Sequence, residues 1–164
     1  MGIVLARIDQ RLIHGIVVTQ WAGYTKAQRL MVIDDELSQD ELRKTAMRMS
    51  KPAGTGMSII SIQRAITNFQ AGKYDDHNVF VIVKEPQALI PLLDAGIAIP
   101  EVNVGILFAG TDKTQISKMV AVNEAEVTAL RELERRQVPV TLRYVPSDPN
   151  KPIEDYLKQL KTKE

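Results

Sequence analysis

Short apolar runs alternate with segments of helical periodicity from one end of this 164-residue chain to the other. The apolar runs predict strands over residues 3–8, 29–33, 57–61, 78–83, 102–107 and 138–144. Strands that alternate with helices pair in parallel, and helices cover both faces of the resulting sheet. The alternation therefore predicts an α/β fold with a mostly parallel central sheet.

Between these runs, apolar residues recur at steps of three or four, which predicts helices over residues 13–24, 42–49, 62–69, 127–133 and 153–160. In the second of these helices, Leu42, Ala46 and Met49 form the apolar stripe. Ser38 and Glu41 have the spacing of a capping box, as do Asn123 and Glu126, so that each pair is expected to begin a helix.

The end of the chain carries turn signals. Pro139 cannot donate to a strand ladder, so the strand over 138–144 is expected near an edge of the sheet. Residues 147–152 are rich in Pro and Asp and predict a turn, whereas residues 118–122 fit either a strand or a helix end. No repeat or linker divides the sequence, and we expect one domain over residues 1–164.

Composition excludes several classes of function. Lys and Arg together number 21 and Asp and Glu 20, which leaves no overall charge to attract nucleic acid or a membrane surface. The chain has no cysteine, which excludes disulfides, thiolate metal sites and thiol catalysis. The sequence also has no signal peptide and no apolar run long enough to span a bilayer. We therefore predict a cytoplasmic protein without direct membrane insertion.

Candidate site residues follow the expected strands, because ligands bind beyond the carboxyl ends of parallel strands. Asp9, Arg11 and His14 come after the first strand. A neutral imidazole can accept a phosphoryl group, and Arg11 can offer a fork of donors to phosphate oxygens. Gly15 would let a phosphate approach the backbone near a helix N-terminus. The plain alternative is that His14 only begins a helix and that the arginines are solvated.

A second group of candidates follows two other strands. Asp34 and Asp35 after the strand over 29–33, with Lys84 after the strand over 78–83, would suit a magnesium or ligand site in a non-catalytic signalling or binding domain of flavodoxin-like type. The simpler interpretation of Asp34 and Asp35 is a solvated loop. His77 precedes a strand and is expected in a surface turn at the opposite edge of the sheet.

The segment RIDQRLIHG at residues 7–15 resembles the phosphorylation motif of enzyme IIB of the mannose family of the bacterial sugar phosphotransferase system (PTS). This family includes mannose, fructose, sorbose and N-acetylgalactosamine transporters. The resemblance extends along nearly the whole chain, through Asp35-Glu36 with Asp40, Asn103-Val104-Gly105, KTQI at 113–116 and VPSDP at 145–149.

The resemblance implies a three-layer α/β/α sandwich and a phosphotransferase. His14 would be phosphorylated at Nδ1 by a phosphohistidine of enzyme IIA, and would pass the group to a sugar hydroxyl presented by the membrane components IIC and IID. Arg11 would stabilise the phosphate, and Asp9 would orient the imidazole or pair with an arginine. Contacts with phosphate or partner would come from Arg7, Gly15 and Asp34. The resemblance implies neither a metal nor an organic cofactor. It does imply peripheral contact with the inner membrane face through IIC and IID.

Ile16 departs from the family pattern, in which Gln is common two residues after the histidine. This difference leaves open a third hypothesis, a structural subunit whose histidine is no longer used. It leaves His14 and Arg11 unchanged.

Overall fold

A seven-stranded sheet forms the centre of the molecule, in the order β3-β2-β4-β1-β5-β8-β9. The computed structural model describes residues 2–163, and the side chains of residues 2–160. All neighbouring strands of the sheet are parallel except the last pair. The seven strands are β1 (Gly2–Asp9), β2 (Arg29–Ile33), β3 (Gly56–Ile60), β4 (Asn78–Val83), β5 (Val102–Ile106), β8 (Val140–Leu142) and β9 (Lys151–Pro152).

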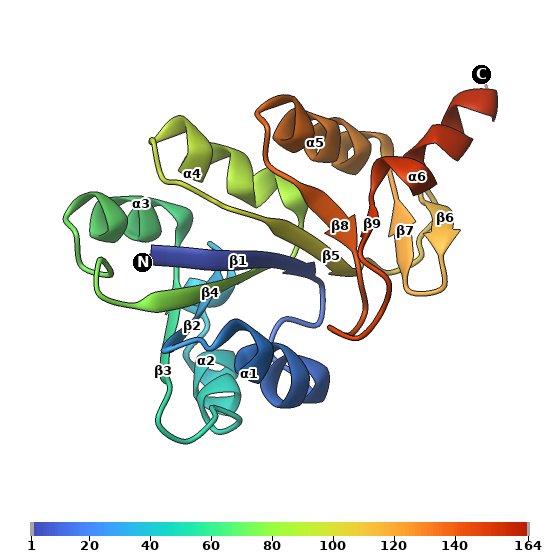
Figure 1. Ribbon diagram of the computed structural model, residues 1–164. Helices are drawn as coiled ribbons and strands as arrows, with labels where there is room; N and C mark the ends of the chain where they lie inside the picture. Colours follow the sequence, from blue (N-terminus) through green and yellow to red (C-terminus); the bar gives the residue numbers. More distant parts are fainter. Residues whose placement is uncertain (1, 164) are drawn as a thin grey trace.

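Helices cover both faces of this sheet (Figure 1). One layer contains η1 (Val17–Trp21), α1 (Ala22–Thr25), η2 (Leu37–Gln39) and α2 (Glu41–Arg48). The other contains α3 (Ile62–Gln70), η3 (Pro86–Leu89), α4 (Ile90–Asp94) and α5 (Glu124–Arg135). The chain closes with α6 (Glu154–Leu157) and η4 (Lys158–Lys163), while β6 (Thr114–Ser117) and β7 (Val120–Val122) form a separate hairpin. The structure confirms the predicted α/β sandwich with a mostly parallel sheet.

Strand periodicity divides the apolar side chains between two cores. In β4, Val79, Val81 and Val83 pack with α3, α4 and α5, whereas Phe80 and Ile82 pack with Leu12, Val17 and Trp21 on the other face. Side chains alternate between the faces of a strand, so a strand buried on both faces is apolar throughout. The same alternation places Arg7 and Asp9 of β1 on one face.

The predicted strand over 138–144 is shorter in the structure. The ladder of β8 spans Val140–Leu142, and beyond it Asp148 accepts the N–H groups of Tyr144 at 3.1 Å and Val145 at 3.2 Å. These bonds turn the chain away from the sheet. Among the described residues, only β9 lies outside β8, in agreement with the predicted edge position, but β9 itself occupies residues expected in a turn. Residues 118–122, which fitted two structures, contribute β7.

The predicted start of α2 was wrong. Its N-cap is Asp40, which accepts the Arg43 N–H, whereas the Ser38 hydroxyl donates to the Asp35 carbonyl inside the preceding turn. The predicted apolar stripe also faces solvent, with Leu42 82% and Met49 84% exposed. The capping box of Asn123 and Glu126 at the start of α5 is confirmed.

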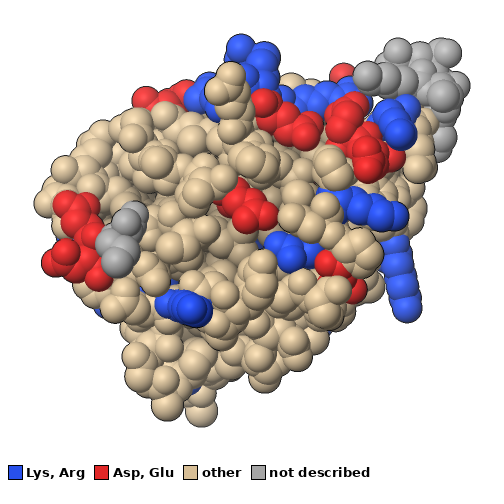
Figure 2. Space-filling model, viewed as in Figure 1, with Lys and Arg blue, Asp and Glu red and all other residues tan. Residues whose placement is uncertain are grey.

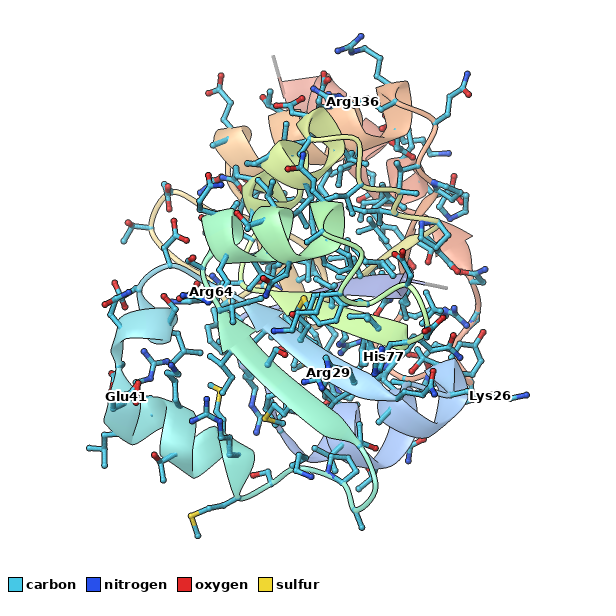
Figure 3. All side chains as sticks on the ribbon, turned by 90° about the vertical axis from the view of Figure 1, so that its left-hand side faces the viewer. Lys26, Arg29, Glu41, Arg64, His77 and Arg136 are labelled. Carbon is cyan, nitrogen blue, oxygen red and sulfur yellow. The ribbon has the colours of Figure 1, made fainter. Side chains whose placement is uncertain are left out.

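The two ends of the sheet carry different elements. Figure 3 shows Lys26 and His77 at one end and Arg64 and Glu41, which lie on α3 and α2, toward the other. On the face shown in Figure 2, acidic and basic side chains are interspersed in the upper part and sparse in the lower part. Within residues 2–163, no helix has the length and apolar character needed to cross a bilayer.

Candidate active site

Residues 10–14 connect β1 to the first helix at the carboxyl end of the sheet. The chain turns sharply there, and Leu12 adopts the left-handed conformation with φ 59° while its side chain is buried. That conformation costs a residue other than glycine about 1–2 kcal/mol. The bond from the Leu12 N–H to the Asp9 carbonyl (3.0 Å) and the burial of the Leu12 side chain hold it in place. The turn brings His14 back over Asp9.

The Asp9 carboxylate organises this turn. Its Oδ1 accepts the Arg11 backbone N–H at 2.9 Å, and its Oδ2 accepts the Arg7 Nε–H at 3.0 Å. Oδ2 also lies 2.7 Å from His14 Nε2. An ionised carboxylate only accepts hydrogen bonds, so Nε2 carries a proton, and an imidazole that is neutral then has its lone pair on Nδ1.

His14 is held close beneath the surface. Its side chain is 6% exposed, and Nδ1 is buried without a hydrogen-bond partner among the described residues. The His14 carbonyl accepts the Val18 N–H at 3.0 Å, which starts the helical segment. This segment continues as a π-helical turn, η1, an irregularity found frequently at functional sites. The arrangement leaves one imidazole nitrogen available for chemistry.

Arg7 is completely buried, and this corrects its predicted contact with phosphate or partner. Its Nη1 donates to Asn103 Oδ1 at 2.6 Å and to the Arg143 carbonyl at 3.1 Å. Its guanidinium lies over the ring of Trp21, 5.0 Å from the centroid. Burial lowers the pKa of Arg7, and the charge of Asp9 opposes this effect. Arg7 therefore supports Asp9 from below the surface.

The other predicted residues of this turn lie at the surface. The Arg11 side chain is exposed and makes no hydrogen bond or ion pair with another described residue. Gly15 is also exposed, and a Cβ atom added there would meet no atom within 4 Å. Ile16 is half-buried and packs against the apolar cluster of Leu12, Val17 and Trp21.

Asp34 lies in a neighbouring cleft of about 430 Å³ and makes no hydrogen bond with His14 among the described residues. Its Oδ2 accepts the Leu37 N–H at 2.8 Å and lies 3.4 Å from Lys84 Nζ. Asp35 instead accepts the Ile62 N–H at 2.9 Å at the start of α3. In the described part of the chain, no group of three or more acidic or histidine side chains is arranged to hold a metal.

The residues that support the turn from β5 and its surroundings were not among the predicted site residues. Gln10 Oε1 accepts the Phe108 N–H after β5, and Trp21 Nε1 donates to the Tyr144 carbonyl at 3.0 Å. A signal was present: Asn103 and Gly105 interrupt an apolar strand, where a polar side chain needs a partner and a glycine indicates close approach of another group.

Comparison with known proteins identifies the family that shares this arrangement. Residues 3–164 match the model of the PTS system sorbose subfamily IIB component. The chain belongs to this family of IIB components. It is therefore a phosphotransferase of a sugar phosphotransferase system, as the resemblance of residues 7–15 implied.

Individual relatives support the same assignment. This IIB component is 34% identical to the sorbose-specific EIIB component of Klebsiella pneumoniae over 97% of both chains. It is 32% identical to the mannose-specific EIIAB component of Escherichia coli K12, over 98% of this chain and 50% of that protein. The crystal structure of the IIBSor domain of the sorbose permease from K. pneumoniae superposes with a TM-score of 0.93 at 34% identity, over 97% of this chain and 98% of the other.

Proposed function

We propose that the chain is a phosphohistidine carrier that accepts a phosphoryl group from enzyme IIA and transfers it to a sugar presented by the membrane components IIC and IID. The observation that carries the proposal is the state of His14. Asp9 holds Nε2, and Nδ1 has no partner among the described residues. An imidazole held in this way is oriented for nucleophilic attack through Nδ1.

In the accepting step, the Nδ1 lone pair attacks phosphorus, and the Nδ1–P bond forms as the P–N bond of the IIA phosphohistidine breaks. The electron pair of the broken bond stays on the donor imidazole. Positive charge develops on the His14 ring, and the Asp9 carboxylate, which accepts from Nε2, stabilises it. In the second step, the oxygen of a sugar hydroxyl bonds to phosphorus as the Nδ1–P bond breaks. The electron pair of that bond returns to Nδ1, and the hydroxyl proton leaves to solvent.

Arg11 and Gly15 would receive the phosphoryl oxygens. The Arg11 guanidinium is exposed near the turn, and a planar fork of N–H donors matches phosphate oxygens. Gly15 leaves open space where a side chain would otherwise stand. Transfer from IIA and onward to the sugar also requires access to Nδ1, which is buried in this structure. We expect the imidazole or residues 10–13 to shift when a partner binds.

We further propose that residues 1–164 act as one functional domain in the cytoplasm, in contact with the inner membrane face through IIC and IID. Partnership with IIA is supported by the relative named as a mannose-specific EIIAB component, which matches this chain over half of its own length.

A labelling experiment tests the assignment of His14. Wild-type protein is incubated with phosphoenolpyruvate, enzyme I, the phosphocarrier protein and a cognate IIA, and phosphate on the chain is measured. We expect one equivalent of acid-labile phosphate in the wild type and in His77→Ala, and none in His14→Ala. Labelling of His14→Ala, or an unlabelled wild type, would contradict the proposal and favour a structural subunit.

A second experiment tests Arg11. The Arg11→Ala variant should be phosphorylated about 10²-fold more slowly, because it loses a charge-assisted phosphate contact. Its free energy of unfolding should stay within about 0.5 kcal/mol of the wild type, as expected for an exposed side chain. Arg43→Ala, which removes an exposed arginine on α2, is the matched control. Equal phosphorylation rates for the two variants would remove Arg11 from the mechanism.

A further inference from the structure

The buried face of β5 beside the site has a gap that only a glycine provides. A Cβ atom added to Gly105 would lie no more than 2.6 Å from Cζ and both Nη atoms of Arg7. Carbon atoms do not approach guanidinium atoms so closely, so a side chain at this position would force Arg7 to move. Arg7 Nη2 makes no hydrogen bond among the described residues and packs into this gap.

Asn103, two residues earlier on the same face of β5, holds the other side of the guanidinium. β1 and β5 are parallel, with Arg7 opposite Asn103. Asn103 Oδ1 accepts from Arg7 Nη1 at 2.6 Å, and its Nδ2 donates to the Arg143 carbonyl at 3.0 Å. That carbonyl also accepts from Arg7 Nη1. These hydrogen bonds are buried, and they fix the guanidinium on the side away from Gly105.

We propose that Asn103 and Gly105 are positioning residues for phosphoryl transfer, which act on His14 through Arg7 and Asp9. Arg7 Nε and His14 Nε2 share the same oxygen of Asp9, at 3.0 Å and 2.7 Å. If the guanidinium shifts, the Asp9 carboxylate either moves with it or loses its hydrogen bond to Arg7 Nε. Either change weakens the contact between Asp9 and His14 Nε2, which keeps the proton on Nε2. The inference rests on the proposed role of His14.

The test uses Gly105→Ala and Asn103→Ala, with Gly23→Ala as the matched control. Gly23 lies in α1, and a Cβ atom added there meets no atom within 4 Å. Two readouts are compared: the tautomer of His14 in the unphosphorylated protein, from the ¹⁵N shifts of its ring, and the rate of phosphorylation by IIA. His14→Ala assigns the ring signals, since the chain has only one other histidine.

We expect the wild type and Gly23→Ala to hold His14 mainly as the Nε2–H tautomer. Gly105→Ala and Asn103→Ala should raise the Nδ1–H fraction and slow phosphorylation about 10²-fold. A merely structural role would lower the unfolding temperature and leave the tautomer unchanged. The Asn103 variant introduces no clash, so it remains informative if Gly105→Ala does not fold.

A wild type with Nδ1–H as its main tautomer would overturn the inference without any variant. Folded variants with the wild-type tautomer and rate would also overturn it. The tautomer is measured without a phosphoryl donor. Failure of the wild type to be phosphorylated would therefore contradict the proposed function, whereas the tautomer tests the positioning separately.

Discussion

Among single residues, Asp9 is the one whose side chain links the turn, the buried Arg7 and His14. One buried carboxylate receives a backbone N–H from Arg11, a guanidinium N–H from Arg7 and the imidazole Nε2 of His14. A buried carboxylate needs such partners, because it has lost its hydration. The residue that orients the imidazole is therefore also the one that neutralises the buried arginine.

Removal of this carboxylate should reduce stability strongly. In Asp9→Ala, Arg7 stays buried without its counter-ion, and we expect the free energy of unfolding to fall by about 3–5 kcal/mol in urea titrations. Asp112→Ala, which removes an exposed aspartate in the loop after β5, should change it by no more than about 0.5 kcal/mol. Similar values for the two variants would show that the pair of Arg7 and Asp9 contributes little to folding.

At the scale of elements, α2 differs from the other long helices because none of its residues is buried. By contrast, α5 buries Ala129, Leu130 and Leu133 against the sheet. Apolar periodicity indicates that a helix has an apolar face, but it does not say what that face contacts. The apolar face of α5 therefore packs against the sheet, whereas the apolar face of α2 is exposed to solvent.

Substitutions on the two helices should differ accordingly. Leu42→Gln and Met49→Gln should each change the free energy of unfolding by less than about 0.5 kcal/mol, because these side chains already contact water. Leu130→Ala in α5 should cost about 2–5 kcal/mol, through lost burial and a cavity. A loss above 1.5 kcal/mol in Leu42→Gln would contradict the exposed orientation of α2.

Two glutamates of α5 should make the stability of the fold depend on pH in opposite directions. Burial raises the pKa of Glu134 and the nearby charge of Glu154 adds to this, whereas hydrogen bonds from Arg135 and Arg136 lower the pKa of Glu132. Ionised Glu134 is therefore less favourable in the folded state, and its cost appears as the pH rises through its folded pKa. Glu132 stabilises the fold above its unfolded pKa, and this contribution is lost as the pH falls through its folded pKa.

At pH 7, Glu134→Gln should accordingly be more stable than the wild type by a few tenths of a kcal/mol, and Glu132→Gln less stable. Both differences should vanish at a pH where the glutamates are protonated in both states. Urea titrations at several pH values between 3 and 7 measure them. Differences of the same sign for the two variants would contradict the assigned environments.

At the scale of the whole molecule, one sheet joins two apolar cores. Trp21, the single tryptophan, is buried in the core under η1 and α1, and Leu130 is buried in the core under α5. Strands β1, β2 and β4 contribute side chains to both cores. If either layer of helices detached, strands that also support the other layer would become exposed to water.

Unfolding should consequently be a single transition. Trp21 fluorescence and far-ultraviolet circular dichroism should give the same urea midpoint. Leu130→Ala, on the face opposite Trp21, should lower both midpoints by the same amount. A fluorescence midpoint that stays at its wild-type value in Leu130→Ala would mean that the two layers unfold independently.

Much of the candidate site could be predicted because its residues are close in sequence. Asp9, Arg11 and His14 lie within one turn after a strand, and a parallel sheet places such turns at its ligand-binding edge. The role of Arg7 could not be predicted in this way. Its partners Asn103 and Arg143 are 96 and 136 residues away, and only the pairing of β1 with β5 and of β5 with β8 brings them together.

The sequence by itself determined the class of fold, the place of His14 and the family, since periodicity, short motifs and their order are local properties of the chain. The packed structure was needed to show which nitrogen of His14 is free, that Arg7 supports Asp9 from the core, and that the apolar stripe of α2 faces solvent. Each of these depends on burial and on partners from distant strands, and the packing of the whole sheet determines both.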